Sequence, residues 1–462
     1  MKTTHTKDMT VGTPWKLIAG FAFPVFLSHV FQQLYNTADS LIVGKYLGTE
    51  ALAAVSSSGP LIFLMVSFFT GTAMGAGVVI SKYFGAKDDD SVSKGVHTAY
   101  ALGIISGVLI TLLGLGFTPT LLRLMNTDAD ILPEAIQYFS VYFCGSLFVV
   151  LYNISTGIMN AVGNSRRPLY YLVISSVMNL LLDFLFIGVF RWGVWSAALA
   201  TVISQVFSAV LCFVYLLRVD SICRLTLSKL RIHRDTLGEI LRYGLPAGIQ
   251  NSVIALANVL VQTNINSFGK EATAAYGSYA KLEGFAFLPI TSFTMALTTF
   301  TGQNLGAGQY ERAKKGSRFG ILCAVGLAEI IGILFFLFAP MLIGLFSDDP
   351  SVIEYGVRQA KTEALFYCLL AFSHAVAAVC RGAGKAFVPM SIMLSVWCIL
   401  RISYITLVMH FIHDIGMIYW AYPLTWGISS VIYFFYYFCS DWIHGFEHQK
   451  EKRAAKALKL SS

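Results

Sequence analysis

The chain has 462 residues, of which 56% are hydrophobic and only 13% are charged, and its formal net charge is +8. Soluble globular proteins carry about 25% charged residues, so this composition excludes an ordinary soluble enzyme. The long apolar segments indicate a polytopic membrane protein instead. Because the basic residues follow the membrane topology described below, the positive charge does not predict a nucleic-acid partner.

Twelve apolar segments are long enough to cross a bilayer, which takes about 20 helical residues each. We predict these spans at 14–43, 51–81, 95–118, 134–159, 168–190, 194–217, 240–266, 272–301, 317–340, 355–380, 387–411 and 417–440. The first segment follows a polar N-terminus and is expected to remain as an uncleaved helix. The predicted fold class is therefore an all-α polytopic membrane protein with twelve transmembrane helices.

The loops between these spans differ in their content of basic residues. Counted from the N-terminus, the loops on the first side of the membrane hold 25 lysines and arginines, and those on the other side hold 5. Loops rich in lysine and arginine stay in the cytoplasm. We therefore expect a multi-pass protein of the inner (cytoplasmic) cell membrane with both termini in the cytoplasm.

The sequence repeats itself when it is shifted by 221 residues. Between residues 48 and 168, 22 of 121 positions are identical to the residue 221 positions later, without a gap. Six spans per half give both halves the same orientation, so we expect two six-helix bundles related by a pseudo-twofold axis along the membrane normal. The predicted parts are an N-terminal lobe, a cytoplasmic linker, a C-terminal lobe and a basic cytoplasmic tail, at 1–218, 219–239, 240–440 and 441–462.

The basic linker leads into the seventh span. Thr236 and Glu239 have the spacing of a capping box, in which the two side chains bond to the backbone at a helix start. We interpret the linker as a cytoplasmic crossover that leads into the seventh helix.

Asp39 and Asp183 place carboxylates inside apolar spans. A buried carboxylate costs on the order of 3 kcal/mol on insertion scales, so such residues are usually functional. The expected use is to bind a proton, a cation or a cationic substrate. The alternative is a pair of hydrogen-bonded packing aspartates near the outer rim.

Polar residues accompany both aspartates at helical spacing. Gln32 and Tyr35 share a helix face with Asp39, and Asn179 lies one turn before Asp183. Two neighbouring carboxylates cannot both ionise cheaply in a low dielectric, so we predict a site that loads and releases a proton. The same oxygens, with those of Asn179 and Thr201, would also ligate Na⁺.

The first span also contains Pro24, which removes one backbone hydrogen bond and is a candidate hinge. The remaining polar residues within the spans are candidates to line a substrate cavity. They are Gln32, Asn36, Asn153, Asn258, Gln262, Lys281, Glu283, Glu363 and Arg401. A neutralised structural network is the alternative for the charged members, with Glu363 paired to Arg401 or Lys281.

The sequence lacks the motifs expected for ATP-driven transport, for a zinc site and for an enzyme that acts on lipid. The segment 382–386 resembles part of a phosphate-binding loop, but Ala386 stands where that loop needs Ser or Thr. Uphill transport would therefore draw on an ion gradient, with H⁺ or Na⁺ as the coupling ion, and we expect no cofactor. The eight cysteines have no zinc-site spacing. An integral-membrane enzyme acting on lipid would need a metal or nucleophile constellation, which the sequence does not offer.

The chain resembles the multidrug and toxic compound extrusion (MATE) family over nearly its whole length. The matching motifs are Pro24 and Asp39, Gly44–Gly48, Ala51–Ala54, Gly85–Ala86, Gly163–Asn164 with Pro168, and Asn179 with Asp183. The resemblance implies two six-helix lobes around a central cleft, alternating access, and export of drugs or metabolites against H⁺ or Na⁺.

Within that family the N-terminal pattern is similar to the DinF-like and archaeal branch. That similarity implies an ion site made by Asp39, Asp183, Asn179 and Thr201, with Tyr35 in the same network. The sodium-coupled NorM-type members carry a Glu in helix seven and an Asp in helix ten. Ile254 and Leu370 stand near those positions here, so a cation site in the C-terminal half is not expected.

We therefore expect an antiporter that works as a monomer in membrane lipid and exports a small organic, cationic substrate. The rival function is a flippase for lipid or a lipid-linked precursor, which has the same duplicated architecture. A flippase is expected to line its cavity with Arg or Lys for phosphates. The predicted spans of the N-terminal half supply only Lys16, at the very start of the first span.

Overall fold

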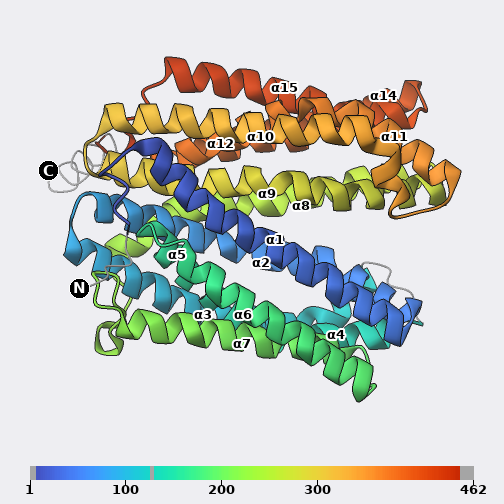
Figure 1. Cartoon of the computed structure of the whole chain (residues 1–462), viewed down its shortest axis with the longest axis horizontal. Helices are drawn as coiled ribbons and strands as arrows, with labels where there is room; N and C mark the ends of the chain where they lie inside the picture. The colour runs from blue at the N-terminus through green and yellow to red at the C-terminus, as the bar shows by residue number, and fades with distance from the viewer. Residues whose placement is uncertain (1–6, 125–129, 448–462) are drawn as a thin grey trace, which may run out of the picture. The chain divides into compact units, whose positions relative to one another are not determined.

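The computed structural model describes residues 7–124 and 130–447, and all secondary structure in them is helical (Figure 1). The helices of the N-terminal half are α1 (Pro14–Leu47), α2 (Thr49–Gly85), α3 (Asp89–Leu124), α4 (Leu132–Cys144), α5 (Ser146–Ala161), α6 (Arg166–Asp183), the π-helical η1 (Phe184–Val189) and α7 (Trp195–Arg218).

A short 3₁₀ turn, η2 (Leu227–Lys229), lies in the segment that joins the two halves. The C-terminal half contains α8 (Arg234–Asn266), α9 (Lys270–Gly306), α10 (Tyr310–Gly344), α11 (Pro350–Glu363), the 3₁₀ turn η3 (Ala364–Phe366), α12 (Tyr367–Gly382), α13 (Phe387–Met393), the π-helical η4 (Leu394–Leu400), α14 (Arg401–Phe411) and α15 (Ile415–Cys439).

These helices fall on the twelve predicted spans. Among the described residues, nine helices or joined helix runs are long and apolar enough to cross a membrane. The α4–α5 pair, bent by 47°, would be a tenth, and α2 and α15 coincide with the two other predicted spans. The predicted all-α polytopic class is confirmed.

The chain divides into two compact units, and the division runs through two helices. One unit holds Leu27–Gly248, and the other holds Met9–Phe26 together with the chain from Ile249 onward. The dividing points lie just after Pro24 in α1 and just after Pro246 in α8. Each of these two helices therefore contributes to both units.

In the first unit, α3 packs against α2, α4 and α5, and α7 packs against α4, α5 and α6. The second unit is built around α9, α10, α12 and α15, whose core includes Leu297, Val376 and Trp426. Ile18 and Phe21 from the start of α1 belong to that same core.

Many large apolar side chains are exposed on the outer faces of both units. Examples are Ile105, Leu112, Leu181, Leu322, Leu337 and Phe435. Apolar exposure on this scale would be a liability in water. Hydrocarbon chains of a bilayer suit it, and it agrees with the apolar spans.

Glycines allow α2 and the first part of α8 to cross at backbone contact within the first unit. A Cβ atom on Gly75 would lie 2.3 Å from the carbonyl oxygen of Ile240, and one on Gly244 would lie 2.5 Å from that of Gly71. Small residues at crossings of this kind let helix backbones approach closely.

Helix α8 begins at Arg234, two residues before Thr236. The Glu239 carboxylate is used elsewhere. It accepts hydrogen bonds from the Tyr83 hydroxyl at 3.0 and 3.1 Å and pairs with Lys82 at 3.4 Å. These contacts fasten the start of α8 to the end of α2.

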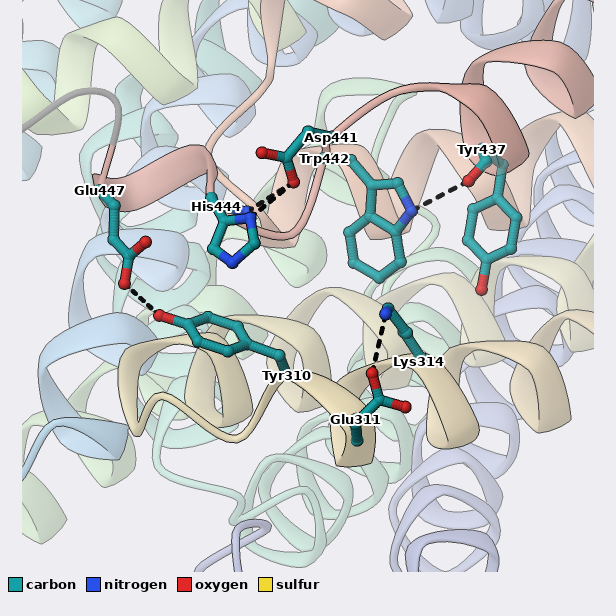
Figure 2. Close-up of polar contacts among 8 residues, drawn as sticks. All are labelled: Tyr310, Glu311, Lys314, Tyr437, Asp441, Trp442, His444 and Glu447. Atoms are coloured by element: carbon teal, nitrogen blue, oxygen red, sulfur yellow. Dashed lines mark hydrogen bonds and ion pairs between the residues drawn. The ribbon is translucent and has the colours of Figure 1, made fainter.

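In each unit, the segment after the unit's last long helix covers the start of an earlier one. In the first unit, the linker after α7 lies over the start of α3, where the Thr226 amide donates to His97 at 3.0 Å. In the second, the tail after α15 lies over the start of α10, where Tyr310 donates to Glu447 (Figure 2). The contacts differ between the units, since a backbone amide meets a histidine in the first and a tyrosine meets a carboxylate in the second.

Candidate coupling site

Asp183 is the last residue of α6, at the point where the helix widens into the π-helical η1. Its side chain is fully buried in the first unit. Single π-helical turns occur preferentially at functional sites. The corresponding span of the other half also contains a π-helical segment, η4, which ends at the buried Arg401.

Asp39 of α1 meets Asp183 inside this unit. The two carboxyl groups interact with each other. Each keeps one buried oxygen, Oδ1, for which the described residues provide no hydrogen-bond partner. Two neighbouring carboxyl groups do not both ionise cheaply in a low dielectric, so a proton on one of them would favour this arrangement.

Asn179 lies one helical turn before Asp183 and is 2% exposed. In the amide orientation that satisfies all its neighbours, its nitrogen donates to Asp183 Oδ2 at 3.2 Å and its oxygen accepts from the Thr201 backbone amide at 3.2 Å. The opposite orientation leaves only a 3.5 Å contact with Thr201 Oγ1. Asn179 therefore links α6 to α7 and fixes one face of the Asp183 carboxylate.

A small cavity of about 10 Å³ lies beside Asn179. It is lined by Tyr35, Leu172, Ser175, Ser176, Asn179, Thr201, Ser204 and Gln205. A volume of this size holds about one water molecule, and a polar lining is what such a water needs. The buried Ser176 hydroxyl and Gln205 carbonyl have no partner among the described residues, so both are available to a small polar guest.

Four of these cavity residues, Ser175, Ser176, Ser204 and Gln205, were missed by the sequence analysis. Their signal was present, because Ser175 and Ser176 precede Asn179 by four and three residues. Ser204 and Gln205 follow Thr201 at the same two spacings. Side chains three and four apart share a helix face.

Tyrosines surround the carboxyl pair. Tyr35 lies near Asp39 and interacts with Gln32. Tyr138 and Tyr142 of α4 also lie close to Tyr35, and Tyr138 interacts electrostatically with both aspartates. The two α4 tyrosines were not predicted from the sequence, because the proximity of side chains on helices far apart in the chain has no local signal.

The second unit buries its own charged residues. Glu363 is fully buried and accepts from Gln359 at 3.0 Å. Arg401, 2% exposed, donates to Thr425 Oγ1 at 3.2 and 2.8 Å, and its guanidinium carbon lies 4.3 Å from the Tyr422 ring centroid. The expected direct pairing of Glu363 with Arg401 or Lys281 is therefore not found among the described residues.

The other candidates for a substrate cavity are divided between the units. Gln32, Asn36 and Asn153 belong to the first unit, and Asn258, Gln262, Lys281 and Glu283 belong to the second. Gln262 donates to Asn266 at 2.8 Å, and the Lys281 ammonium lies 5.7 Å from the Phe346 ring centroid. The structure does not assign a substrate to any of them.

The fold and the site define an internally duplicated helical membrane protein whose first unit contains the neighbouring carboxyl groups of Asp39 and Asp183. The MatE family model matches both halves, at residues 24–185 and 246–407. The chain therefore belongs to the multidrug and toxic compound extrusion family. It is a membrane transporter and not an enzyme.

Curated relatives agree with this assignment. The "Probable multidrug resistance protein YoeA" of Bacillus subtilis is 28% identical over 444 residues, which cover 94% of this chain and 95% of the relative. The "Probable multidrug resistance protein NorM" of Thermotoga maritima is 27% identical over 389 residues, which cover 83% of each chain.

Solved structures share the fold. A MOP superfamily transporter from Pyrococcus furiosus, described as having a binding pocket of reverse polarity, superposes with a TM-score of 0.89 at 24% identity, covering 94% of this chain and 98% of its own. A structure titled "Crystal structure of MATE in the straight conformation" gives 0.87 at 25% identity, with the same coverage.

Proposed function

We propose that this chain is a secondary active antiporter that exports small organic, cationic substrates in exchange for a proton. The single observation that carries the proposal is the carboxyl pair of Asp39 and Asp183. The Asp183 side chain is fully buried in one half of a transporter fold and interacts with the half-buried Asp39. Two carboxyl groups so placed do not both ionise cheaply, which favours a bound proton. Loading and releasing that proton would change the charge at the centre of the first unit.

Sodium is the alternative coupling ion. Carboxylate, amide and hydroxyl oxygens of Asp39, Asp183, Asn179 and Thr201 are hard ligands of the kind that alkali cations accept. The described contacts favour the proton, because Asn179 presents its nitrogen to Asp183 in the orientation that satisfies its neighbours. A cation at Asp183 would have to compete with that donor.

The exchange would work by alternating access of two lobes, 1–218 and 240–440. Pro24 is the proposed hinge, since a proline leaves a helix short of one backbone hydrogen bond. The division of α1 between the two units falls two residues after it. Protonation would alter what α1 contacts beyond the hinge and so shift the balance between the two states, which needs only a difference in proton affinity between them.

The substrate class rests on two kinds of support. Relatives over most of the chain are named multidrug resistance proteins, and the site offers carboxylates rather than cations to a ligand in the first unit. A lipid-linked precursor flippase would need basic residues for phosphates. The predicted N-terminal spans contain only Lys16, at the very start of the first span.

The decisive experiment measures efflux of a fluorescent organic cation from proteoliposomes under a pH gradient and, separately, a sodium gradient. Wild-type protein should respond to the pH gradient, and Asp39→Asn and Asp183→Asn should each abolish that response. Asp235→Asn, at an exposed position in the first turn of α8, is the matched control and should transport normally. Efflux that survives both site substitutions would refute the proposed coupling site.

We also propose that the protein is a monomer in the cytoplasmic membrane with both termini inside. The uneven distribution of lysine and arginine between loops supports this topology. Asp235→Cys, in a variant from which the other cysteines have been removed, should be labelled by an impermeant maleimide only after cells are opened. Labelling in intact cells would show that the topology is opposite to the proposed one.

A further inference from the structure

A second cavity, of about 320 Å³, lies in the first unit between the first turns of α3 and the linker that follows α7. This volume is within the range of about 300–1,000 Å³ that ligand pockets occupy. Its lining includes Lys94, Lys229 and Arg231, two histidines, His97 and His233, and one carboxylate, Asp90. The coupling site described above uses none of these residues.

The charges of this cavity do not cancel. Three cationic side chains face one carboxylate, and that carboxylate already pairs with Lys94 at 2.5 Å. Among residues 7–124 and 130–447, no carboxylate pairs with Lys229 or Arg231 within 4.0 Å. Lys229 and Arg231 therefore present two positive charges at the cavity wall that no described carboxylate neutralises.

The pKa of His233 is affected by the positive charges around this cavity. Burial, followed by the positive charges of Arg231 and Lys94 and by His97, holds the pKa of the His233 imidazole below its usual value, against the opposing effect of Asp90. Arg231 Nε also donates to His233 Nε2 at 3.3 Å, which requires the neutral ring. The cavity thus disfavours a further positive charge.

The walls of the cavity are fixed by hydrogen bonds between the linker and α3. His97 Nε2 accepts from the Thr226 amide at 3.0 Å, so its Nδ1 carries the hydrogen and donates to the Ser93 carbonyl at 2.6 Å. The His233 amide donates to Thr98 Oγ1 at 3.2 Å. The linker is therefore held across the start of α3 on both sides of the cationic residues.

The duplicated position in the second unit is closed differently. There the tail lies over the start of α10, with the His444 and Tyr310 rings 4.8 Å apart and Glu447 accepting from Tyr310 (Figure 2). Aromatic rings and a carboxylate occupy that place, whereas the first unit presents a cation-lined cavity. The basic cavity is thus a property of one half and not a consequence of the repeat.

We propose that this cavity binds a phosphate group, supplied either by the headgroup of an anionic phospholipid or by a free phosphate. Arg and Lys are the side chains that recognise phosphate, Arg through its fork of N–H donors and Lys as a point charge. The cavity adjoins the start of a membrane-spanning helix, so a lipid headgroup at the bilayer surface can reach it. The proposal does not depend on which substrate the protein exports.

The test uses purified full-length protein and two variants with equal loss of charge. Lys229→Gln/Arg231→Gln removes two cations from the cavity wall. Arg234→Gln/Arg242→Gln removes two exposed arginines from the first turns of α8 that do not line it. In one arm, native mass spectrometry measures retention of phosphatidylglycerol against phosphatidylcholine. In the other, calorimetry measures binding of inorganic phosphate to delipidated protein in detergent.

Wild-type protein should bind in at least one arm. Each basic residue near an anionic surface contributes about fivefold or less to affinity. The cavity variant, which lacks two of them, should therefore bind about tenfold more weakly than the wild type. The α8 variant should lose less than twofold in affinity. Retention of phosphatidylglycerol without measurable phosphate binding identifies a lipid headgroup, and phosphate binding identifies the free anion. Absence of binding in both arms, or equal losses in the two variants, would overturn the proposal.

Discussion

Asp39 of α1 and Asp183 of α6 place interacting carboxyl groups inside an apolar bundle, and each keeps a buried oxygen that has no hydrogen-bond partner among the described residues. A pair selected only for packing would be expected to satisfy those oxygens, because a buried unsatisfied polar group costs about 1–3 kcal/mol. The arrangement therefore sacrifices stability at one place, as functional sites commonly do.

The first prediction separates function from stability at this pair. Asp39→Asn and Asp183→Asn each replace a buried carboxyl group by a neutral amide of similar shape, which is often neutral or stabilising. We expect melting temperatures in detergent equal to or above that of the wild type, together with complete loss of proton-coupled efflux. A melting temperature that falls by many degrees in both variants would instead identify the aspartates as structural.

Much of the fold was predictable because the membrane imposes it. Apolar runs of the required length locate the spans, and the 221-residue repeat explains why α2 and α9 have the same length and the same positive-φ glycine before them, Gly48 and Gly269. The grouping of Asp183 with Asn179 was predictable for a similar reason, since a helix fixes which side chains share a face.

Contacts between helices were not predictable in the same way. The sequence around Arg401 does not show that its guanidinium donates to the Thr425 hydroxyl and lies over the Tyr422 ring. The assignment of Met9–Phe26 to the second unit depends likewise on packing between segments far apart in the chain. A single sequence reports helical periodicity, whereas partners across a bundle depend on side-chain shape.

The second prediction concerns Asn179, which joins Asp183 to the Thr201 amide. Asn179→Ala should leave both partners unsatisfied and lower the free energy of unfolding by about 1–3 kcal/mol, with reduced efflux because the Asp183 carboxyl loses its positioning. Asn153→Ala is the matched control, since the Asn153 side chain donates to the Val149 carbonyl within its own helix at 2.8 Å. It should change stability by less than about 1 kcal/mol. Equal losses in the two variants would contradict the linking role.

The third prediction is a titration of His233 in the linker. Its pKa is held low by burial and then by Arg231 and Lys94, so removing one positive neighbour should raise the pKa toward the usual value. In protein labelled with ¹³C-histidine, Arg231→Gln should move the His233 midpoint upward, while Arg234→Gln should leave it in place. A downward shift in Arg231→Gln would show that the positive field around the cavity has been misassigned.

The fourth prediction tests the crossing of α2 and α8. A side chain at Gly75 would meet the Ile240 carbonyl at 2.3 Å, and backbone atoms cannot move aside as a flexible side chain can. Overpacking usually lowers the free energy of unfolding by about 1–3 kcal/mol. Gly75→Val should lower it by more than this, or prevent the protein from folding. Gly116→Val, in α3 with nothing within 4 Å of its Cβ position, should fold normally. Thermal unfolding of the two purified variants makes the comparison, and a stable Gly75→Val protein would disprove the close crossing.

The last prediction concerns Arg401, which interacts electrostatically with both Glu283 and Glu363 although neither forms an ion pair with it in the described chain. Removing a cation from buried carboxylates is costly, typically 3–5 kcal/mol, because the charges left behind are uncompensated. Arg401→Gln should therefore be strongly destabilised. Arg401→Lys should lose less, since it keeps the charge but not the planar contact with Tyr422 and the paired bonds to Thr425.

Adding Glu363→Gln to Arg401→Gln should then restore part of the lost stability, because the uncompensated carboxylate is removed together with its cation. Chemical unfolding of the wild type, the two single variants and the double variant gives the coupling energy between the two positions, which we expect to exceed about 1 kcal/mol for groups in one buried network. Strict additivity would mean that Arg401 acts through Thr425 and Tyr422 alone. In that case the charged residues of the second unit would be separate packing features.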